Sequence, residues 1–308
     1  MMIKKPKFWD LKKPNFLAYL LMPLSKLVSL FGAFGKGENL KFTDIKIICV
    51  GNIYVGGTGK TPLSIKICNL LNKDNFKSTV VKKFYSDQRD EQVLISNKAN
   101  LISKNNRKKC IESAVSKNFR YAIFDDGLQD KSINYDIKIC CFNSNNWIGN
   151  GHVIPAGPLR EKITSLKNFD IVIINGPDIN NSHIKEEILK INNNIEIFEG
   201  QYKPQNLNKL DRSKNYIAFS GIGNPENFNF TLKENDFKIL KYFSFPDHYN
   251  YKNYEINNIK RFAIKNNSEI ITTEKDFLRI NKELRKDINY IEMDLIISNE
   301  NKLLKLIS

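Results

Sequence analysis

The stretch YVGGTGKTP at residues 54–62 carries residue types that can bind the phosphates of a nucleotide. It fits the last three positions of the pattern G-x-x-x-x-G-K-[ST], but Tyr54 stands where the leading glycine belongs. Backbone N–H groups can surround phosphate oxygens, Lys60 can reach the β- and γ-phosphates, and the Thr61 hydroxyl can hold Mg²⁺. The predicted nucleotide-binding residues are Tyr54, Val55, Gly56, Gly57, Thr58, Gly59, Lys60 and Thr61.

Two adjacent carboxylates follow the apolar run of YAIFDDG at residues 121–127. A buried strand would deliver Asp125 and Asp126 to its carboxyl end, where ligands bind in open α/β sheets. One carboxylate can accept a hydrogen bond from magnesium-bound water or coordinate Mg²⁺ directly. Both are candidate metal ligands, and the residue pattern does not decide between them.

A phosphoryl acceptor must be deprotonated or positioned, and carboxylates or histidines at the same sheet edge are the candidates. Asp90 and Glu91 fall in the polar segment 84–92, which we expect to be a loop, and His248 lies in FPDHYNY. Taken singly, each of these residues would be an ordinary surface residue. LNKD at residues 71–74 lacks the N-K-x-D spacing of guanine-binding proteins, which argues against a GTPase.

The elements that must position these residues alternate along the first two-thirds of the chain. Helices are expected at 61–71 and 107–117, and apolar runs predict strands at 45–51, 78–82, 121–127, 136–142 and 170–176. This alternation predicts an α/β fold of the P-loop NTPase type, a parallel sheet covered by helices, followed by a second, smaller α/β domain. The expected segments are an N-terminal helix at 1–40, a P-loop core domain at 41–197 and a C-terminal domain at 198–308.

Charge is the unusual feature of the composition, with 48 Lys+Arg against 33 Asp+Glu and a formal net charge of +15. Such a surface favours polyanions: nucleic acid, anionic lipid headgroups or phosphorylated substrates. Many lysines occur among Asn and Ile, so compositional bias accounts for part of the excess. Because the sequence contains no basic-aromatic repeat or nucleic-acid reader module, we expect no nucleic-acid partner.

The five cysteines form no C-x-x-C pair and their number is odd. We interpret them as buried free thiols in a reducing compartment rather than as a disulfide framework or a zinc site. They are Cys49, Cys68, Cys110, Cys140 and Cys141.

The N-terminal segment is basic and then apolar, and between residues 16 and 34 its only charge is Lys26. Pro23 and two serines interrupt the run, which is marginal against the roughly 20 apolar residues that a membrane span needs. A phosphate-binding loop follows, and ATP is cytosolic, so a cleaved signal peptide is not expected. We expect a helix on the membrane surface; the alternative is a helix packed on the protein's own core.

Six motifs occur in order along most of the chain: VGNIYVGGTGKTP at 50–62, RDE at 89–91, FDDGLQD at 124–130, GNGHVIPAGPLRE at 149–161, FSFPDHYNY at 243–251 and TTEKDF at 272–277. Together they resemble the tetraacyldisaccharide 4'-kinase family, the lipid A 4'-kinases of Gram-negative bacteria. The family's phosphate loop also carries a non-glycine residue where Tyr54 stands.

The resemblance implies phosphoryl transfer from ATP, with Mg²⁺, to the 4'-hydroxyl of a tetraacylated glucosamine disaccharide 1-phosphate. It places the enzyme, which we expect to be a monomer, on the cytoplasmic face of the bacterial inner membrane. By the matching motifs, Asp90 is the general base and His248 its partner, a pair that can act at neutral pH. The resemblance further implies catalysis by Lys60, metal binding by Thr61, Glu91 and Asp125 or Asp126, and a substrate or phosphate contact by Arg160.

Three segments depart from the family pattern. The usual Ser-Arg-Gly-Tyr-Gly run is KKFYSD at 82–87, where Lys82 or Lys83 can replace the charge but not the planar fork of arginine. The segment up to Asp90 is short, and Asp130 stands where the family's DDGxQH ends in histidine. The alternatives are a P-loop ATPase or kinase acting on a soluble metabolite, a diverged paralogue with an altered substrate, and a nucleotide-gated partner protein.

Overall fold

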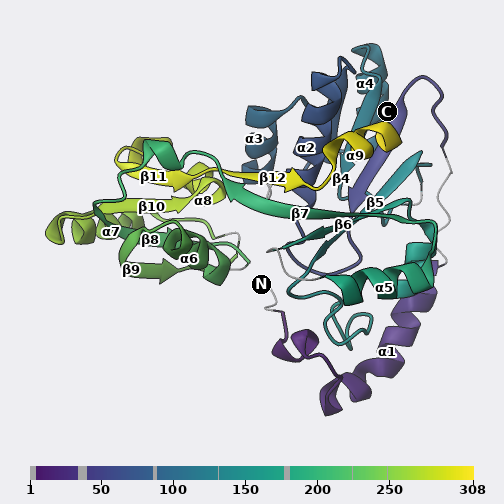
Figure 1. The fold of residues 1–308 in the computed structure, drawn as a ribbon, viewed down its shortest axis with the longest axis horizontal. Coiled ribbons are helices and arrows are strands. Elements are labelled where there is room, and N and C mark those ends of the chain that lie inside the picture. Colours follow the sequence, from purple (N-terminus) through teal and green to yellow (C-terminus); the bar gives the residue numbers. More distant parts are fainter. Residues whose placement is uncertain are drawn as a thin grey trace. The chain divides into compact units, whose positions relative to one another are not determined.

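The computed structural model describes residues 5–33, 40–85, 89–130, 132–176, 181–223, 225–247 and 249–308. Its contacts divide the chain into two compact units (Figure 1). The first comprises residues 1–86, 98–202 and 295–308, and the second comprises 87–97 and 203–294. The sequence-based scheme of 1–40, 41–197 and 198–308 differs in four places: the structure groups 1–40, 198–202 and 295–308 with the core unit, and 87–97 with the second unit.

An eight-stranded sheet lies at the centre of the first unit, in the order β12-β7-β6-β5-β1-β4-β2-β3. Strands β1 to β7 pair in parallel, which confirms the predicted fold class. The strands are β1 (Lys46–Gly51), β2 (Ser78–Lys83), β3 (Leu101–Lys104), β4 (Tyr121–Asp125), β5 (Ile137–Asn143), β6 (Ile171–Asn175), β7 (Glu196–Pro204) and β12 (Met293–Ile297). The sequence did not predict β3, because LISK is only four residues long and half apolar.

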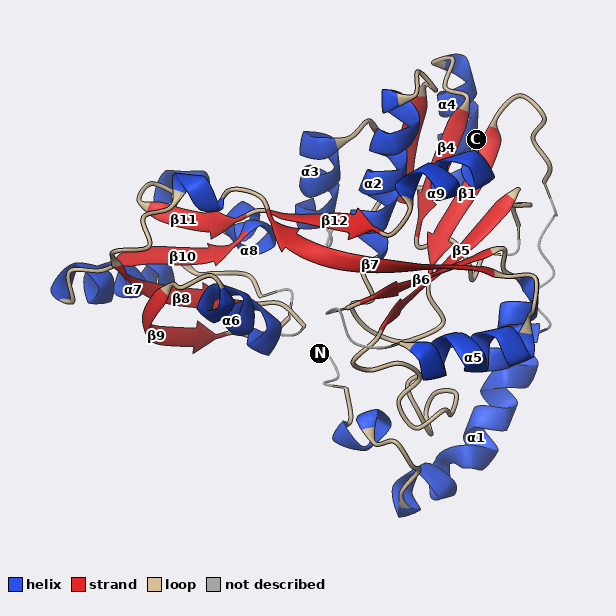
Figure 2. Ribbon diagram, in the orientation of Figure 1, coloured by secondary structure: helices blue, strands red, loops and turns tan. Residues whose placement is uncertain are grey.

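Helices cover both faces of this sheet, because the central strands are buried on both sides. Alternation along the strands puts Phe124 of β4 in one apolar cluster with Ile111, and Phe142 of β5 in another with Ile188. The helices over this face are α4 (Arg107–Ser116) and α5 (Ser182–Ile191). Over the opposite face lies α2 (Lys60–Lys73), with α9 (Glu300–Ile307) against it (Figure 2). The short 3-10 helix η3 (Ile163–Asn168) follows the loop at 149–161.

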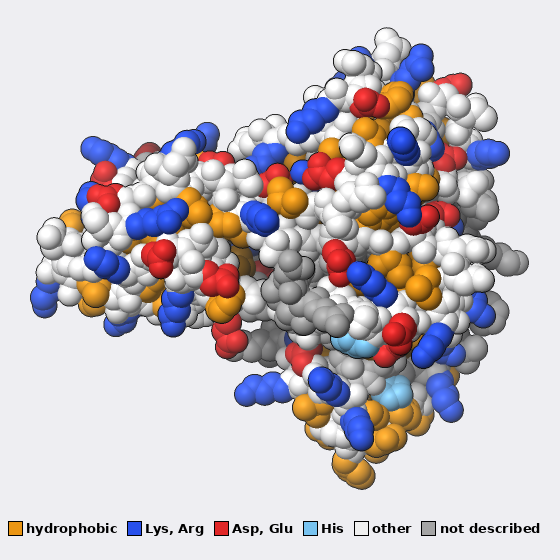
Figure 3. All heavy atoms as spheres, viewed as in Figure 1, with side chains coloured by type: hydrophobic (Ala, Val, Ile, Leu, Met, Phe, Trp, Pro, Cys, Tyr) orange, Lys and Arg blue, Asp and Glu red, His pale blue; other side chains and the backbone are white. Residues whose placement is uncertain are grey.

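The N-terminal part forms the 3-10 helix η1 (Lys7–Asp10) and the helix α1 (Phe16–Ala33). Helix α1 is attached to the first unit through the buried Ser25, whose hydroxyl donates to Val153 O (2.8 Å) and accepts from Ala156 N (3.0 Å). Several apolar side chains of α1 face solvent, and they form part of the apolar surface in Figure 3: Phe16, Leu17, Tyr19, Leu20, Leu24 and Leu27. In the part of the chain that the structure describes, no helix combines the length and the apolar character needed to cross a bilayer.

The second unit is built on a four-stranded parallel sheet in the order β11-β10-β8-β9. Alternate residues of β8 face opposite sides, so that Phe219 packs with α7 and Tyr216 packs with α6. The elements are α3 (Arg89–Lys98), β8 (Asn215–Ser220), α6 (Pro225–Glu234), β9 (Lys238–Ser244), α7 (Asn253–Lys265), β10 (Glu269–Thr273), α8 (Glu274–Arg279) and β11 (Ile288–Ile291).

Helix α3 corrects one expectation from the sequence. The segment 84–92 was expected to be a loop, but the helix begins at Arg89 and places Asp90 and Glu91 in its first turn. Negative side chains at this end are favoured by the helix dipole, which offsets the polar character that suggested a loop. Residues 86–88 lie outside the described part of the chain.

All five cysteines are buried and free, as predicted. Burial raises the pKa of the Cys140 thiol well above its ordinary value, and the pKa of Cys141 is raised for the same reason. Both side chains therefore stay protonated and pack as apolar residues of β5.

Phe219 tests the core of the second unit, because it is fully buried and packs edge-on against Tyr251 with ring centroids 5.4 Å apart. Phe219→Ala should lower the free energy of unfolding by about 3–5 kcal/mol through the cavity it leaves. Phe230 in the same unit is 58% exposed, and Phe230→Ala should change the stability by less than about 0.5 kcal/mol. Urea denaturation of the full chain, followed by circular dichroism, measures both, and equal midpoints would contradict this packing.

Candidate active site

The phosphate loop occupies the turn between β1 and α2, as the sequence predicted. Asn52 is fully buried beneath it and closes it by donating from Nδ2 to Tyr54 O (2.6 Å) and Thr58 Oγ1 (2.9 Å). Two glycines in the loop take positive φ values, +131° at Gly56 and +91° at Gly59, which L-residues rarely adopt. The residue pattern alone indicated no role for Asn52; the only signal in the sequence was its place directly after a buried strand.

The inner and outer sides of this loop differ. A Cβ on Gly59 would lie 2.2 Å from Tyr202 Oη and 2.6 Å from Asn175 Nδ2, so the inner side is closely packed. A Cβ on Gly57 would meet nothing within 4 Å. The open side next to the first turn of α2 is therefore suited to an anion, which would meet backbone N–H groups and the positive end of the helix dipole.

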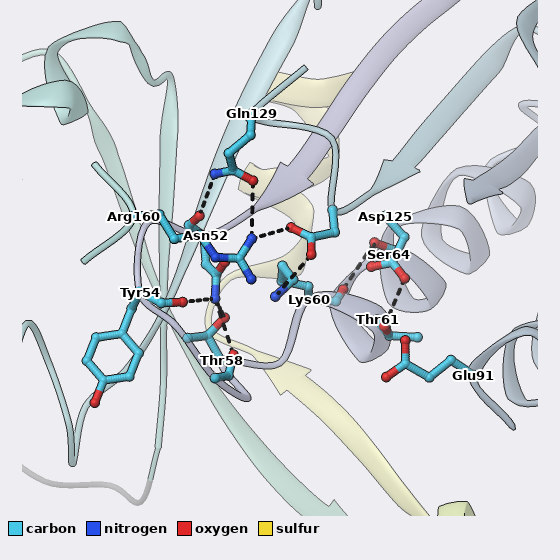
Figure 4. A network of polar contacts seen from close by, with 12 residues as sticks. Asn52, Tyr54, Thr58, Lys60, Thr61, Ser64, Glu91, Asp125, Gln129 and Arg160 are labelled. Atoms are coloured by element: carbon cyan, nitrogen blue, oxygen red, sulfur yellow. Dashed lines mark hydrogen bonds and ion pairs between the residues drawn. The ribbon is translucent and has the colours of Figure 1, made fainter. Parts of the chain in front are cut away.

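Tyr54 can occupy the position of the leading glycine because its side chain packs away from the loop. Its ring is buried with Val153 and Leu159, and its hydroxyl donates to Asp10 Oδ1 at 2.6 Å. Burial raises the pKa of this phenol, and the neighbouring Asp10 carboxylate raises it further. Because the ring lies away from Lys60 (Figure 4), only the backbone of Tyr54 faces the loop, and a large side chain is tolerated there.

Asp125 is the buried member of the carboxylate pair. Its Oδ2 accepts from Thr61 Oγ1 (2.9 Å) and from Lys82 Nζ (2.6 Å), and its Oδ1 lies 3.4 Å from Ser64 Oγ (Figure 4). Because Thr61 donates its proton to this carboxylate, its oxygen lone pairs are left for another partner.

Asp126 is the more exposed member, and its backbone takes a φ of +62° after the end of β4. Its carboxylate lies 3.7 Å from Lys60 Nζ and 3.2 Å from an Arg160 guanidinium nitrogen. The same nitrogen donates to Gln129 Oε1 (3.2 Å), and Gln129 Nε2 donates to Asn52 O (3.1 Å). Lys60 and Arg160 therefore place two positive charges at the open side of the loop.

The oxygen atoms beside the loop fit a magnesium ion. Mg²⁺ prefers oxygen ligands and is bound by one or two protein groups together with substrate phosphates. The Thr61 hydroxyl and the carboxylates of Asp125 and Asp126 form such an oxygen set. Within the described residues no group of three or more His, Cys, Asp or Glu side chains is placed so that it could hold a metal ion.

Asp90 and Glu91 belong to the second unit and are held there by α8. The Nε and Nη2 atoms of Arg279 each lie 2.8 Å from Asp90 Oδ2, and Lys275 Nζ lies 3.0 Å from Glu91 Oε1. Arg279 is in turn held by Asp276, at 3.0 Å from its Oδ1. Arg279 lies two residues beyond the motif TTEKDF, whose residue types alone indicated no role for it.

Asp276 is fully buried and anchors this second network. It accepts hydrogen bonds from the Tyr251 hydroxyl (2.9 Å) and the Thr273 hydroxyl (2.7 Å). Burial and the nearby Asp276 carboxylate raise the pKa of Tyr251, which therefore remains a hydrogen-bond donor. His248, the predicted partner of Asp90, lies outside the described residues.

Asp130, which departs from the family's histidine, forms an ion pair with Arg107 at 2.6 Å. Arg107 also donates to the backbone oxygen of Asp126 (2.8 Å). Burial disfavours the charged form of Asp130, but hydrogen bonds from Ser132 and Arg107 outweigh it and hold the pKa below its usual value. The departure is therefore accommodated by an ion pair that supports the turn carrying Asp126.

The structure thus brings together Lys60, Thr61, Asp125, Asp126 and Arg160 in the first unit, and Asp90 and Glu91 in the second. Their catalytic, metal-binding and substrate-binding roles stay predictions.

Comparisons with known proteins agree with the motifs. The model of the family described as tetraacyldisaccharide-1-P 4'-kinase matches residues 17–308. A protein of Pelagibacter ubique (strain HTCC1062), named tetraacyldisaccharide 4'-kinase, is 47% identical over 310 residues, which cover 99% of both chains. A protein of the same name from Rickettsia bellii (strain OSU 85-389) is 34% identical and covers 97% of this chain and 96% of its own.

The fold has a counterpart among solved structures. The crystal structure of LpxK from Aquifex aeolicus in complex with ATP matches with a TM-score of 0.71 at 21% identity, over 95% of this chain and 98% of that one. The resemblance inferred from the six motifs is confirmed by the family match. The chain belongs to the tetraacyldisaccharide-1-P 4'-kinase family.

Proposed function

We propose that this chain transfers the γ-phosphoryl group of ATP to the 4'-hydroxyl of a tetraacylated glucosamine disaccharide 1-phosphate, a step of lipid A biosynthesis. The observation that carries the proposal is the phosphate loop, with Thr61 hydrogen-bonded to Asp125 and Lys60 beside Asp126, in a member of this kinase family. Phosphoryl transfer depends mainly on positioning and charge neutralisation, which such a loop provides.

The loop and the side chains around it have separate proposed roles. Backbone N–H groups of residues 55–59 hold the phosphates, and Lys60 stabilises the charge on the transferring group. Arg160 contacts a phosphate or the disaccharide. The metal ligands are Thr61, Glu91 and one of Asp125 and Asp126. The chemistry that Mg²⁺ supplies when bound is neutralisation of phosphate charge.

Asp90 acts as the general base on the 4'-hydroxyl, with His248 as its partner. The hydrogen bond from Arg279 Nε and the ion pair with its Nη2 support this role, because a base must be held in one orientation to accept a proton in the transition state. The buried Asp276 holds Arg279 from behind.

The substrate class calls for a membrane-surface enzyme, and α1 supports this location. Its exposed apolar side chains would enter the acyl boundary, while the exposed Lys12, Lys13 and Lys26 meet anionic headgroups. We propose that the protein acts as a monomer on the cytoplasmic face of the inner membrane.

A transfer assay tests the proposed activity. Purified protein in detergent receives γ-labelled ATP, Mg²⁺ and the disaccharide 1-phosphate lipid. Lys60→Ala should lower kcat by about 10²–10³-fold, because a charge stabiliser is lost. Asp90→Ala should lower it by about 10²–10⁴-fold, because the base is lost. Lys73→Ala, at the exposed end of α2, is the matched control and should leave the rate unchanged.

The assay also separates the alternatives. No label in the lipid despite ATP binding would instead support a diverged paralogue, or an enzyme acting on a soluble acceptor. Full activity of Asp90→Ala would contradict the role of general base.

Arg279 offers a test of how Asp90 is held. Arg279→Ala should lower kcat by about 10–100-fold while leaving the KM for ATP nearly unchanged, because the base loses its orientation. Arg279→Lys should restore part of the rate, since one donor can still reach the carboxylate. Arg261→Ala, exposed on α7, serves as the control. An unchanged kcat in a folded Arg279→Ala protein would show that this ion pair does not position the base.

Membrane binding by α1 is measurable without catalysis. The double variant Leu20→Ser/Leu24→Ser should lower the partition coefficient onto vesicles containing anionic phospholipid by about tenfold or more, because two half-exposed apolar side chains no longer enter the acyl boundary. Leu240→Ser/Ile264→Ser in the second unit removes comparable exposed apolar groups as a control. Equal cosedimentation of the two double variants would count against α1 as the membrane contact.

A further inference from the structure

Lys82 is a buried cation inside the phosphate-loop site that the proposed mechanism does not use. Its side chain is 6% exposed, and its Nζ lies 2.6 Å from Oδ2 of Asp125, whose side chain is 0% exposed. Strands β2 and β4 are neighbours with Val81 beside Phe124, so the next residues, Lys82 and Asp125, project to the same side. Ser78, four residues earlier on β2, donates to Cys68 O of α2 at 2.9 Å, which identifies this side as the face that α2 covers.

The ion pair between Lys82 and Asp125 can stay buried only if both charges are present. Removing two charges from water costs several kcal/mol for each ion, and the mutual attraction offsets this cost only if both partners are present. The Thr61 hydroxyl also donates a hydrogen bond to Oδ2 of Asp125, and the Ser64 hydroxyl donates one to Oδ1. The carboxylate is therefore neutralised before any ligand arrives.

This neutralisation affects the place where a cation would bind. Thr61 Oγ1 and Lys82 Nζ contact the same oxygen of Asp125, at 2.9 Å and 2.6 Å. A divalent cation on the free lone pairs of Thr61 would lie near the ammonium, and like charges at such distances repel strongly in a buried site. The Asp126 carboxylate also has cations beside it, Lys60 Nζ at 3.7 Å and an Arg160 nitrogen at 3.2 Å, but it is one-third exposed. Because water screens these exposed pairs, the Asp126 oxygens remain available to a divalent cation.

We propose that Lys82 is a resident counter-ion of Asp125 that lowers the affinity of the phosphate-loop site for divalent cations. Asp125 then serves as a positioning residue that orients the Thr61 hydroxyl, and Asp126 is the carboxylate that meets the metal. The inference rests on the proposed function only in placing the metal and nucleotide at this loop.

Mn²⁺ binding tests the proposal without turnover or lipid. Free Mn²⁺ is measured by electron paramagnetic resonance during titration of the full chain, with and without a non-hydrolysable ATP analogue. Lys82→Met should bind Mn²⁺ about tenfold or more tightly than the parent protein, because the repulsion is lost and Asp125 regains a free charge. Lys83→Met changes the net charge equally at the adjacent position, which projects to the other side of β2, and should leave the affinity unchanged.

Two further measurements connect the effect to Asp125. The double variant Lys82→Met/Asp125→Asn should lose the gain in affinity, because the uncompensated carboxylate is gone. Thermal melting of Lys82→Met should be lowered in EDTA and largely recovered by Mg²⁺, whereas the parent should respond much less. If Lys82→Met does not fold, Lys82→Gln keeps a polar side chain and permits the same titration.

Equal Mn²⁺ affinity of Lys82→Met and Lys83→Met would overturn the proposal, as would a gain that survives in the double variant. Absence of Mn²⁺ binding in every protein would overturn it as well. Failure of the proposed lipid phosphorylation is a separate result, because the titration contains neither the lipid acceptor nor a transferable phosphoryl group.

Discussion

A carboxylate without access to water must be neutralised and hydrogen-bonded by its neighbours. In the first unit that carboxylate is Asp125. Its burial at the end of β4 requires the Lys82 ammonium from β2 and the Thr61 and Ser64 hydroxyls from α2. These contacts connect two strands and a helix at the carboxyl edge of the sheet. The orientation of Thr61, and through it the chemistry of the loop, follows from this one electrostatic constraint.

The loop itself depends on a second buried polar group. The amide of Asn52 replaces the backbone partners that a tight loop lacks, and Asn175 fills the space under Gly59 while donating to Thr58 O at 2.7 Å. With its inner side packed, the loop presents its open side to a ligand with no need for a leading glycine. Preorganisation of this kind lowers the cost of ordering the loop when phosphate binds.

The second unit also contains a buried carboxylate that its neighbours must neutralise. Asp276 is fully buried, and its hydrogen bonds from Tyr251 and Thr273 leave its remaining capacity to Arg279. Arg279 then directs its other nitrogens to Asp90. A buried anion thus fixes a guanidinium, and the guanidinium fixes a second carboxylate near the start of α3. Such a chain of charge-assisted bonds holds a side chain more firmly than a single surface ion pair would.

The sequence by itself determined the phosphate loop, the strand that ends in Asp125 and Asp126, the parallel α/β fold and the family. These features depend on residues close together in the chain, through apolar periodicity and through glycine and lysine at fixed spacing. Only the tertiary structure decided that Lys82 lies against Asp125, that Asn52 closes the loop, that Arg279 holds Asp90, and that α3 begins where a loop was expected. Those pairings depend on which strands and helices become neighbours and in what register, because contacts between buried charges are specified by packing across the sheet and not by spacing along the chain.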